Sequence, residues 1–304
     1  MLSEDHITEF LQSRSFLPLT KKKYRSLLAR YVCDVVPDPD TWEQGSVRWL
    51  EGLKVEPNTK RYYFDVLHSF LNWCLSRGYV PSNPMKLMKI RLSTMPLRYA
   101  LTSEEVQKLV SVTRQKKDER ALRDCAIIIF MLHTGLRVGG VSGLDVQDFI
   151  QVKPGRIIAK YKGKGHIGKD SFVVVPEIGV RGIDEYLKLR KSKLFASDQG
   201  AVFLTVWKDK CRLTESRMRE TIRERMVEAK IKRPGICVHS LRHTAATMAY
   251  RSGADIMAIK EMLDHRSLET TQGYLHSIDR IEGAAELKID YGLETRTDTK
   301  KRRK

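Results

Sequence analysis

The sequence predicts a mainly α-helical protein of two domains, the second of which carries a small antiparallel β-sheet. Its 304 residues are more than a single hydrophobic core usually needs. Apolar side chains recur at three- and four-residue spacing through most of the chain, which is typical of amphipathic helices. Two short stretches between residues 156 and 176 are rich in β-branched and aromatic residues and are joined by a glycine-bearing turn, which predicts a β-hairpin.

Residues 1–80 form the first predicted domain, a unit of helices without a strand. We expect helices over residues 3–12, 21–36, 41–53 and 59–77. Ser3 and Thr20 are suited to cap the first two helices, and Gly78 is suited to end the fourth. Residues 81–100, in which prolines interrupt the helical pattern, are expected to be a basic linker. This linker could follow a DNA backbone or serve only as a soluble tether.

Six basic residues gather at the starts of two of these helices and are candidates for binding DNA. They are Lys21, Lys22, Lys23, Arg25, Lys60 and Arg61. Positive charges oppose the helix macrodipole at a helix N-terminus, so another partner must favour them there. A solvated surface is one interpretation. The net charge of +18 favours the other, which is contact with a phosphate backbone.

Residues 101–292 form the second predicted domain, and a basic tail covers residues 293–304. Thr102 and Glu105 fit a capping box that starts the first helix of this domain. The nearly continuous apolar run 126–132 is expected to be central to the core. We expect helices over 103–113 and 119–133, a helix through Val141 and Leu144, strands over 156–162 and 171–176, and helices over 178–191, 215–230, 240–251, 255–263 and around Tyr274.

The composition argues against several classes of protein. No apolar run reaches the roughly 18 residues of a membrane span, so no membrane partner is expected. The five cysteines are widely spaced and lack a Cys-x-x-Cys pair, which indicates free thiols in a reducing compartment, the cytoplasm with its nucleoid. No phosphate-binding glycine loop and no paired-carboxylate motif occurs, so we expect neither a cofactor nor a metal.

Four residues near the end of the second domain suit the chemistry of a phosphodiester. His239 and Arg242 lie three apart at the start of a predicted helix and can therefore face one ligand. His265 follows Arg242 by 23 residues, and Tyr274 follows His265 by nine. Two imidazoles, a guanidinium and a phenol that meet at one point would suit an anionic, oxygen-rich reacting centre.

Five motifs in order resemble those of the tyrosine recombinases, the phage integrase family. They are Thr134-Gly135-Leu136-Arg137, Lys164 within Gly-Lys-Gly, His239-x-x-Arg242-His243, Leu263-Asp264-His265 and Thr270-Thr271-Gln272-x-Tyr274. The resemblance covers residues 101–281, and the helical first half is similar to the SAM-like core-binding domain of that family. It implies an α+β tyrosine-recombinase catalytic domain in a two-domain, Xer-like protein. We expect this simple type because the first predicted helix already begins at Ser3.

The resemblance implies a role for each catalytic residue. Tyr274 would be the nucleophile and would form a 3′-phosphotyrosyl link to DNA. Arg137 and Arg242 would bind the non-bridging oxygens of the scissile phosphate. His239 would be the base, and His265 would donate a hydrogen bond to a non-bridging oxygen.

Lys164, at the tip of the predicted hairpin, would protonate the departing 5′-oxygen. Lys162 and Lys169 are rivals for this role, and Lys164 could instead be a solvated tip residue. For the nucleophile, Tyr250 and Tyr291 are poorer candidates because neither has the interval of the family.

Two residues depart from the pattern of the family. Gly140, three after Arg137, stands where an acidic residue often orients the arginine, although Asp148 matches an acidic position further along. Asp264 stands where glycine is usual before the histidine, and aspartate is among the residues that best tolerate a left-handed backbone. Both departures bear on the subfamily and the rate rather than on the reaction.

The implied function is site-specific recombination, in which duplex DNA is cleaved and rejoined for integration, excision, or resolution of mobile elements or replicon dimers. Two duplexes and four cleaving subunits imply a homotetramer on DNA, and an accessory or partner recombinase is an open alternative. The amphipathic segment 278–292 is a candidate for docking on a neighbouring subunit or on its own domain. Two alternative functions are a type IB topoisomerase-like DNA relaxing enzyme and a non-catalytic DNA-binding regulator on the same fold.

Overall fold

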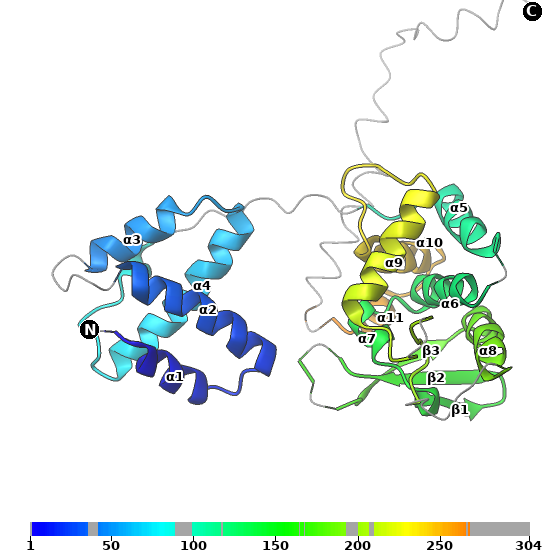
Figure 1. The fold of residues 1–304 in the computed structure, drawn as a ribbon, viewed down its shortest axis with the longest axis horizontal. Helices are drawn as coiled ribbons and strands as arrows, with labels where there is room; N and C mark the ends of the chain where they lie inside the picture. Colours follow the sequence, from blue (N-terminus) through cyan, green and yellow to red (C-terminus); the bar gives the residue numbers. More distant parts are fainter. Residues whose placement is uncertain are drawn as a thin grey trace, which may run out of the picture. The chain divides into compact units, whose positions relative to one another are not determined.

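The computed structural model describes residues 2–35, 42–88, 99–116, 118–163, 165–166, 168–192, 200–206, 210–265 and 267. The chain divides into two compact units, Met1–Pro96 and Leu97–Lys304, each with its own hydrophobic core (Figure 1). No helix among the described residues is long and apolar enough to cross a membrane. The predicted helix around Tyr274 and the predicted basic tail lie outside these residues.

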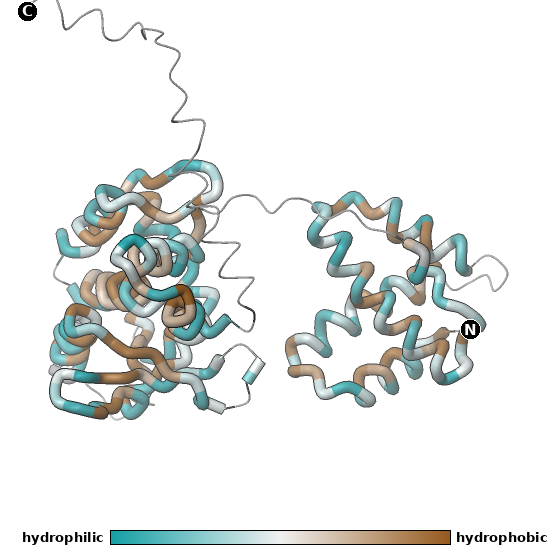
Figure 2. The backbone as a smooth tube through the Cα atoms, turned by 180° about the vertical axis from the view of Figure 1, so that it is seen from behind, coloured by the Kyte–Doolittle hydropathy of each residue, from teal (hydrophilic) through white to brown (hydrophobic). Residues whose placement is uncertain are grey.

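The N-terminal unit is entirely helical over its described residues, as the sequence predicts. Its elements are α1 (Glu4–Gln12), α2 (Pro18–Val35), α3 (Trp42–Gly52), α4 (Pro57–Ser76) and the 3₁₀ helix η1 (Pro84–Leu87). Each α-helix contributes a fully buried side chain to the core, namely Phe10, Tyr31, Leu50 and Phe70. Figure 2 shows apolar and polar residues alternating within these helices, which is the pattern of helices with one buried face.

Helix α2 begins at Pro18, three residues before the predicted start at Lys21. Proline suits the first turn of a helix, because it has no amide hydrogen to leave unpaired and its φ is already helical. The Lys21 amide donates to the Leu17 carbonyl over 2.9 Å. Thr20 is therefore inside the helix and does not cap it, and the basic residues that follow lie beyond the first turn.

The predicted linker begins too early, because its first part packs on the N-terminal unit. Asn83 caps η1 by accepting a hydrogen bond from the Met85 amide over 2.9 Å. Met85 is fully buried, and η1 contacts α3 and α4. Residues 81–88 thus belong to the helical unit, whereas residues 89–98 lie outside the described part of the chain.

The C-terminal unit is built around one buried helix. Its helices are α5 (Ser103–Arg114), α6 (Glu119–Thr134), α7 (Val138–Ser142), η2 (Val146–Asp148), α8 (Glu177–Ser192), α9 (Glu215–Glu228), α10 (His239–Arg251) and α11 (Ile256–Met262), and its strands are β1 (Phe149–Lys153), β2 (Arg156–Tyr161) and β3 (Ser171–Val175). Helix α6 packs against α5, α8, α10 and β3. Every residue from Ala126 to Met131 is at most 4% exposed, which confirms the predicted core run. The predicted helix through Val141 ends at Ser142, before Leu144.

The sheet contains three antiparallel strands in the order β1-β2-β3, one more than the sequence predicted. β1 is an edge strand without a buried residue, and Gln151 separates its apolar residues Phe149 and Ile150 from Val152. In β2 and β3, Ala159 pairs with Val173, and Tyr161 pairs with Ser171. This register places Tyr161 and Ser171 side by side where the hairpin turn begins.

Buried charged side chains join α6 to α9. The Asp124 carboxylate is fully buried and accepts hydrogen bonds from Arg123 Nη2 at 2.7 Å and from Arg225 Nη2 at 2.8 Å. Toward the surface, Arg120 pairs with Glu224 at 2.6 Å. Because a buried carboxylate is costly unless it is paired, the hydrogen bonds from both arginines offset the cost of burying Asp124.

Candidate active site

The turn after α6 positions the first predicted catalytic arginine. Gly135 ends α6 in the left-handed region with φ +65°. A β-carbon on Gly135 would lie only 3.0 Å from Leu263 Cδ2, so glycine is needed both for the turn and for the close approach of the α11 end. Arg137 follows as the N-cap residue of α7 and is half-buried.

Arg242 joins this turn to the end of α11. Its guanidinium is almost completely buried and donates to the Gly135 carbonyl over 2.8 Å and to the Leu263 carbonyl. These two carbonyls belong to the segments that carry Arg137 and His265. Arg242, on α10, therefore joins the two segments, and the two carbonyls fix the orientation of its guanidinium.

His265 lies within electrostatic reach of both arginines. Burial lowers the pKa of its imidazole, and the positive charges of Arg242 and Arg137 lower it further, to about 4. The imidazole is therefore neutral at neutral pH and has one N–H group to donate. A neutral donor within electrostatic reach of two guanidinium groups suits a site that binds an oxyanion.

Helix α10 begins at His239, so His239 and Arg242 occupy its first turn, as the three-residue spacing predicts. His239 is half-buried, as is His243 one residue past the arginine. Three separate segments thus bring His239, Arg137, Arg242 and His265 to one region of the C-terminal unit.

The root of the β2–β3 hairpin lies against this region. A β-carbon on Gly163 would lie 2.9 Å from Asp264 Oδ2 and 2.9 Å from Ser171 Oγ. Gly163 directly precedes Lys164, which lies outside the described residues, as does Tyr274. The start of the hairpin therefore lies against the segment that carries His265.

Lys169, one rival of Lys164, is engaged elsewhere. Its ammonium contacts Asp148 and donates to Asp145 over 2.7 Å. Burial alone lowers the pKa of Lys169, but the hydrogen bonds to both carboxylates outweigh burial and raise it above the ordinary value. A lysine held more firmly in its charged form is a poorer general acid. The other rival, Lys162, is exposed.

Tyr161 is a residue of this site that the sequence reasoning missed. It is 4% exposed, and burial together with the Asp264 carboxylate raises the pKa of its phenol, while Arg242, Arg137 and a hydrogen bond with Ser171 act to lower it. It lies two residues after Ala159 on β2, so both side chains point to the same face, and the strand pattern alone could have placed Tyr161 on the buried face. A cleft of about 670 Å³ opens beside Tyr161, Asp264 and His265, between β3 and α11.

The six predicted DNA-binding residues lie on two helices that meet in the N-terminal unit. The Tyr24 and Tyr62 rings, with centroids 6.2 Å apart, link the start of α2 to the start of α4. Three of the six make contacts within the unit. Arg25 Nη1 donates to Thr8 Oγ1 at 3.1 Å, Lys60 Nζ donates to the Glu51 carbonyl at 2.8 Å, and Arg61 pairs with Asp65 at 3.0 Å. Lys22 and Lys23 are exposed, and Lys21 is half-buried.

The family model described as the phage integrase family matches residues 100–280, which is more than half of the chain. The chain belongs to the phage integrase family. Within it, the chain is a tyrosine recombinase of Xer-like type, a DNA strand-transferring enzyme of site-specific DNA recombination.

Two tyrosine recombinases are similar in sequence to this chain over most of its length. Tyrosine recombinase XerC of Pelobacter propionicus is 30% identical over 240 residues, which cover 76% of this chain and 72% of that protein. Tyrosine recombinase XerC of Salmonella typhi is 30% identical over 274 residues, 86% of each protein. These relatives favour a recombinase over the topoisomerase-like enzyme and the non-catalytic regulator.

Solved structures share the fold. The XerH site-specific recombinase bound to palindromic difH substrate matches with a TM-score of 0.71 at 19% identity, over 94% of this chain and 86% of that one. A lambda integrase dimer bound to a COC′ core site matches with a TM-score of 0.69 at 15% identity, over 90% of this chain and 95% of that one. The predicted fold class, helical domain followed by an α+β catalytic domain, is confirmed.

Proposed function

We propose that Tyr274 attacks a DNA phosphodiester that is held by Arg137, Arg242 and His265. The observation that supports this proposal is the convergence of these three described residues from three segments, fixed by the hydrogen bonds of Arg242 to the Gly135 and Leu263 carbonyls. Two guanidinium groups and a neutral imidazole give several donors for the non-bridging oxygens of one phosphate. Such donors stabilise most strongly the state in which negative charge grows on those oxygens.

The proposed reaction replaces one phosphate ester by another. The phenol oxygen of Tyr274 forms a bond to phosphorus while the bond to the 5′-oxygen breaks. His239 accepts the phenol proton, and Lys164 gives a proton to the departing oxygen, so the products are a 5′-hydroxyl and a 3′-phosphotyrosyl link. The link keeps the energy of the phosphodiester. Attack by the 5′-hydroxyl of another strand then releases the tyrosine and rejoins the DNA.

Duplex DNA is the proposed partner of both units. XerH and the lambda integrase were solved bound to their recombination sites, and this chain carries a net charge of +18. In the N-terminal unit, the contact between Tyr24 and Tyr62 brings the basic residues of α2 and α4 close together. We assign Lys22 and Lys23, both exposed, to the phosphate backbone, and we expect the protein to be found with the nucleoid.

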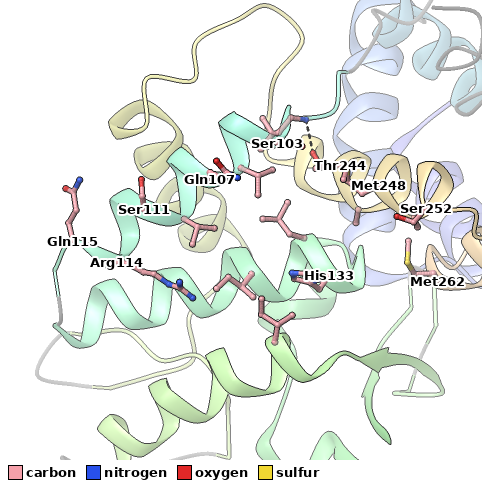
Figure 3. Close-up of a pocket in the computed structure, with 18 residues that line it drawn as sticks. Ser103, Gln107, Ser111, Arg114, Gln115, His133, Thr244, Met248, Ser252 and Met262 are labelled. Atoms are coloured by element: carbon pink, nitrogen blue, oxygen red, sulfur yellow. Dashed lines mark hydrogen bonds between the residues drawn. The ribbon is translucent and has the colours of Figure 1, made fainter. Parts of the chain in front are cut away.

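A groove in the C-terminal unit supports the proposal that the enzyme works as a tetramer. It has a volume of about 970 Å³, and Figure 3 shows side chains from α5, α6 and α10 pointing into it. Val106, Val110 and Leu132 are among its apolar lining residues, and Arg114 also lines it. The segment 278–292 carries the apolar residues Ile281, Leu287 and Ile289 among four acidic and two basic residues, which would match both the apolar lining and Arg114. We propose that this segment of a neighbouring subunit occupies the groove.

Charge introduced into the groove tests this assignment. Val106→Glu should still bind a single recombination site but should fail to form a complex of four subunits on two sites, as measured by mass photometry. Lys108→Glu, on the same helix but outside the groove lining, is the matched control. A tetramer that forms equally well with Val106→Glu would contradict the docking, and so would full assembly after residues 278–304 are removed.

The general-acid role of Lys164 has a direct chemical test. Lys164→Ala should cleave an ordinary DNA strand much more slowly than the wild type. A substrate with a 5′-phosphorothiolate at the scissile position should restore most of the rate, because a thiolate leaves without protonation. Lys162→Ala is the matched control and should keep the wild-type rate on both substrates. If Lys164→Ala lost the same fraction of its cleavage rate on both substrates, Lys164 would not be the general acid.

A further inference from the structure

The packing around Gly163 leaves no room for a side chain. A β-carbon on Gly163 would lie 2.9 Å from Ser171 Oγ, from His166 Cδ2 and from Asp264 Oδ2, closer than real β-carbons approach other atoms. Gly163 does not have a positive φ, so a left-handed turn is not what favours glycine here. Glycine is required because three polar side chains fill the space next to its Cα.

Two of these three side chains belong to the hairpin, and one comes from another segment. Ser171 pairs with Tyr161 across β2 and β3, and the His166 amide donates to the Gly163 carbonyl over 3.2 Å. Asp264 lies far along the chain, in the turn that follows α11. The Asp264 side chain therefore connects the root of the hairpin to the end of α11.

The backbone of Asp264 is fixed in an unusual conformation. Its φ of +49° lies in the left-handed region, which costs free energy for a residue with a side chain and little for glycine. The Asp264 amide donates to the Glu261 carbonyl over 2.9 Å, and the His265 amide donates to the Lys260 carbonyl over 3.1 Å. Aspartate at this position costs stability that glycine would not, and what its side chain provides is the contact with Gly163.

Each partner of this contact directly precedes a residue with a proposed role in the reaction. His265 follows Asp264, and Lys164 follows Gly163. Because consecutive Cα atoms are about 3.8 Å apart, restraining Gly163 restrains the point from which residue 164 extends. The contact thus restrains the segment that carries the lysine relative to the segment that carries the imidazole.

The other end of the same loop is fixed by ion pairs. Lys169 donates to Asp145 over 2.7 Å and also contacts Asp148. Both carboxylates lie shortly after α7 in the chain. The loop between Gly163 and Lys169 is therefore attached to the rest of the C-terminal unit at both ends.

We propose that Asp264 is a positioning residue for the general acid Lys164. Its side chain holds Gly163 at a fixed distance from the turn that carries His265, so that Lys164 reaches the departing 5′-oxygen of the phosphate. The inference rests on the proposed function, in which Lys164 protonates that oxygen. Asp264 acts on protonation of the leaving group and not on binding of the phosphate.

Two substitutions of Asp264 separate the contact from the fold. Asparagine tolerates the left-handed backbone and keeps a side-chain oxygen of the same reach, so Asp264→Asn should form the covalent adduct within about threefold of the wild-type rate. Asp264→Gly removes the contact without backbone strain, and its thermal midpoint should equal or exceed that of the wild type. Its rate of adduct formation on a nicked substrate should fall about ten- to hundredfold, because a misplaced catalytic group is that costly.

The leaving group shows whether the loss passes through Lys164. On a substrate with a 5′-phosphorothiolate, departure needs no proton, so Asp264→Gly should come within about threefold of the wild type on that substrate. An equal loss on both substrates would overturn the proposal, because it would place the effect at the phosphate or at His265. Wild-type rates of Asp264→Gly on the ordinary substrate, or an Asp264→Asn variant as slow as Asp264→Gly, would also overturn it.

A second position tests the contact from the side of the hairpin. Gly163→Ala should slow cleavage, because its methyl group would displace the Asp264 side chain. In Gly163→Ala/Asp264→Gly this part of the collision is gone, so the double variant should lose less than the product of the two single losses. Losses that simply multiply would mean that the two residues act independently, and would contradict the contact.

Two controls keep the outcomes apart. Glu261→Gln removes an exposed carboxylate from the end of α11 and should change either rate by less than about twofold. A loss in this control equal to that of Asp264→Gly would assign the effect to charge at α11 and overturn the proposal. Lys164→Ala is the reference on both substrates. If the phosphorothiolate does not rescue Lys164→Ala, the proposed function fails, whereas if it rescues Lys164→Ala and not Asp264→Gly, only this inference fails.

Discussion

Replacing His265 by Gln should change how the stability of the protein depends on pH. The pKa of His265 is lowered from 6.5 to about 4 by burial and by the charges of Arg242 and Arg137. The unfolded chain therefore binds a proton at this residue more readily than the folded chain. As the pH falls from 6.5 toward 4, the wild type should lose stability that the variant does not lose.

The magnitude follows from the size of the shift. A change from 6.5 to about 4 corresponds to about 3 kcal/mol when complete. Solvent around a half-buried ring reduces this, so we expect a loss on the order of 1–2 kcal/mol. The negative charge of a bound DNA phosphate should offset the positive charges of Arg242 and Arg137 and so raise the pKa of His265. NMR titration of the complex can measure this pKa.

The assay is chemical denaturation of wild type and His265→Gln at pH 7 and at pH 4.5. The free energy of unfolding of the wild type minus that of the variant should decrease at the lower pH. Taking this difference cancels other titrating groups, such as His133, whose pKa burial also lowers. A difference that stays constant between the two pH values would refute the electrostatic account of the site.

Two further predictions concern the two units separately. Asp124→Ala should destabilise the C-terminal unit by about 3–5 kcal/mol, because Arg123 and Arg225 would be left buried without their carboxylate. Urea denaturation measures this loss, and a loss below about 1 kcal/mol would contradict the stabilising role of the Asp124 hydrogen bonds. Lys22→Glu/Lys23→Glu should weaken binding to any DNA sequence and lower the slope of log affinity against log salt by about 2, and an unchanged slope would place the phosphate contacts elsewhere.

Helix ends were predictable where one side chain supplies the cap. The Thr102–Glu105 capping box is observed at the expected position. Helix α9 begins at Glu215, as predicted, and Thr214 caps it by accepting a hydrogen bond from the Arg217 amide. The start of α2 was not predictable, because Pro18 and Thr20 both suit a helix start. The hydrogen bond from the Lys21 amide to the Leu17 carbonyl shows that the helix begins at Pro18. Strand β1 was missed because Gln151 interrupts its short apolar stretch and none of its side chains is buried.

The candidate residues Arg137, Arg242 and His265 could be picked out because their motifs have characteristic sequence intervals. The reason for their convergence could not, since it depends on the hydrogen bonds of Arg242 to carbonyls 107 and 21 residues away. Tyr161 was overlooked for the same reason. Its importance comes from the β2–β3 register and from the approach of Asp264, contacts between segments far apart in the chain.

The most direct test of the central claim is to identify the amino acid that becomes joined to DNA. The protein is incubated with a nicked substrate carrying its recombination site, digested with protease, and the DNA-linked peptide is sequenced by mass spectrometry. The account predicts a peptide linked through Tyr274 to a 3′-phosphate, with a free 5′-hydroxyl on the other strand end, and no adduct from Tyr274→Phe. A link through Tyr250 or Tyr291, or to a 5′-phosphate, would contradict it.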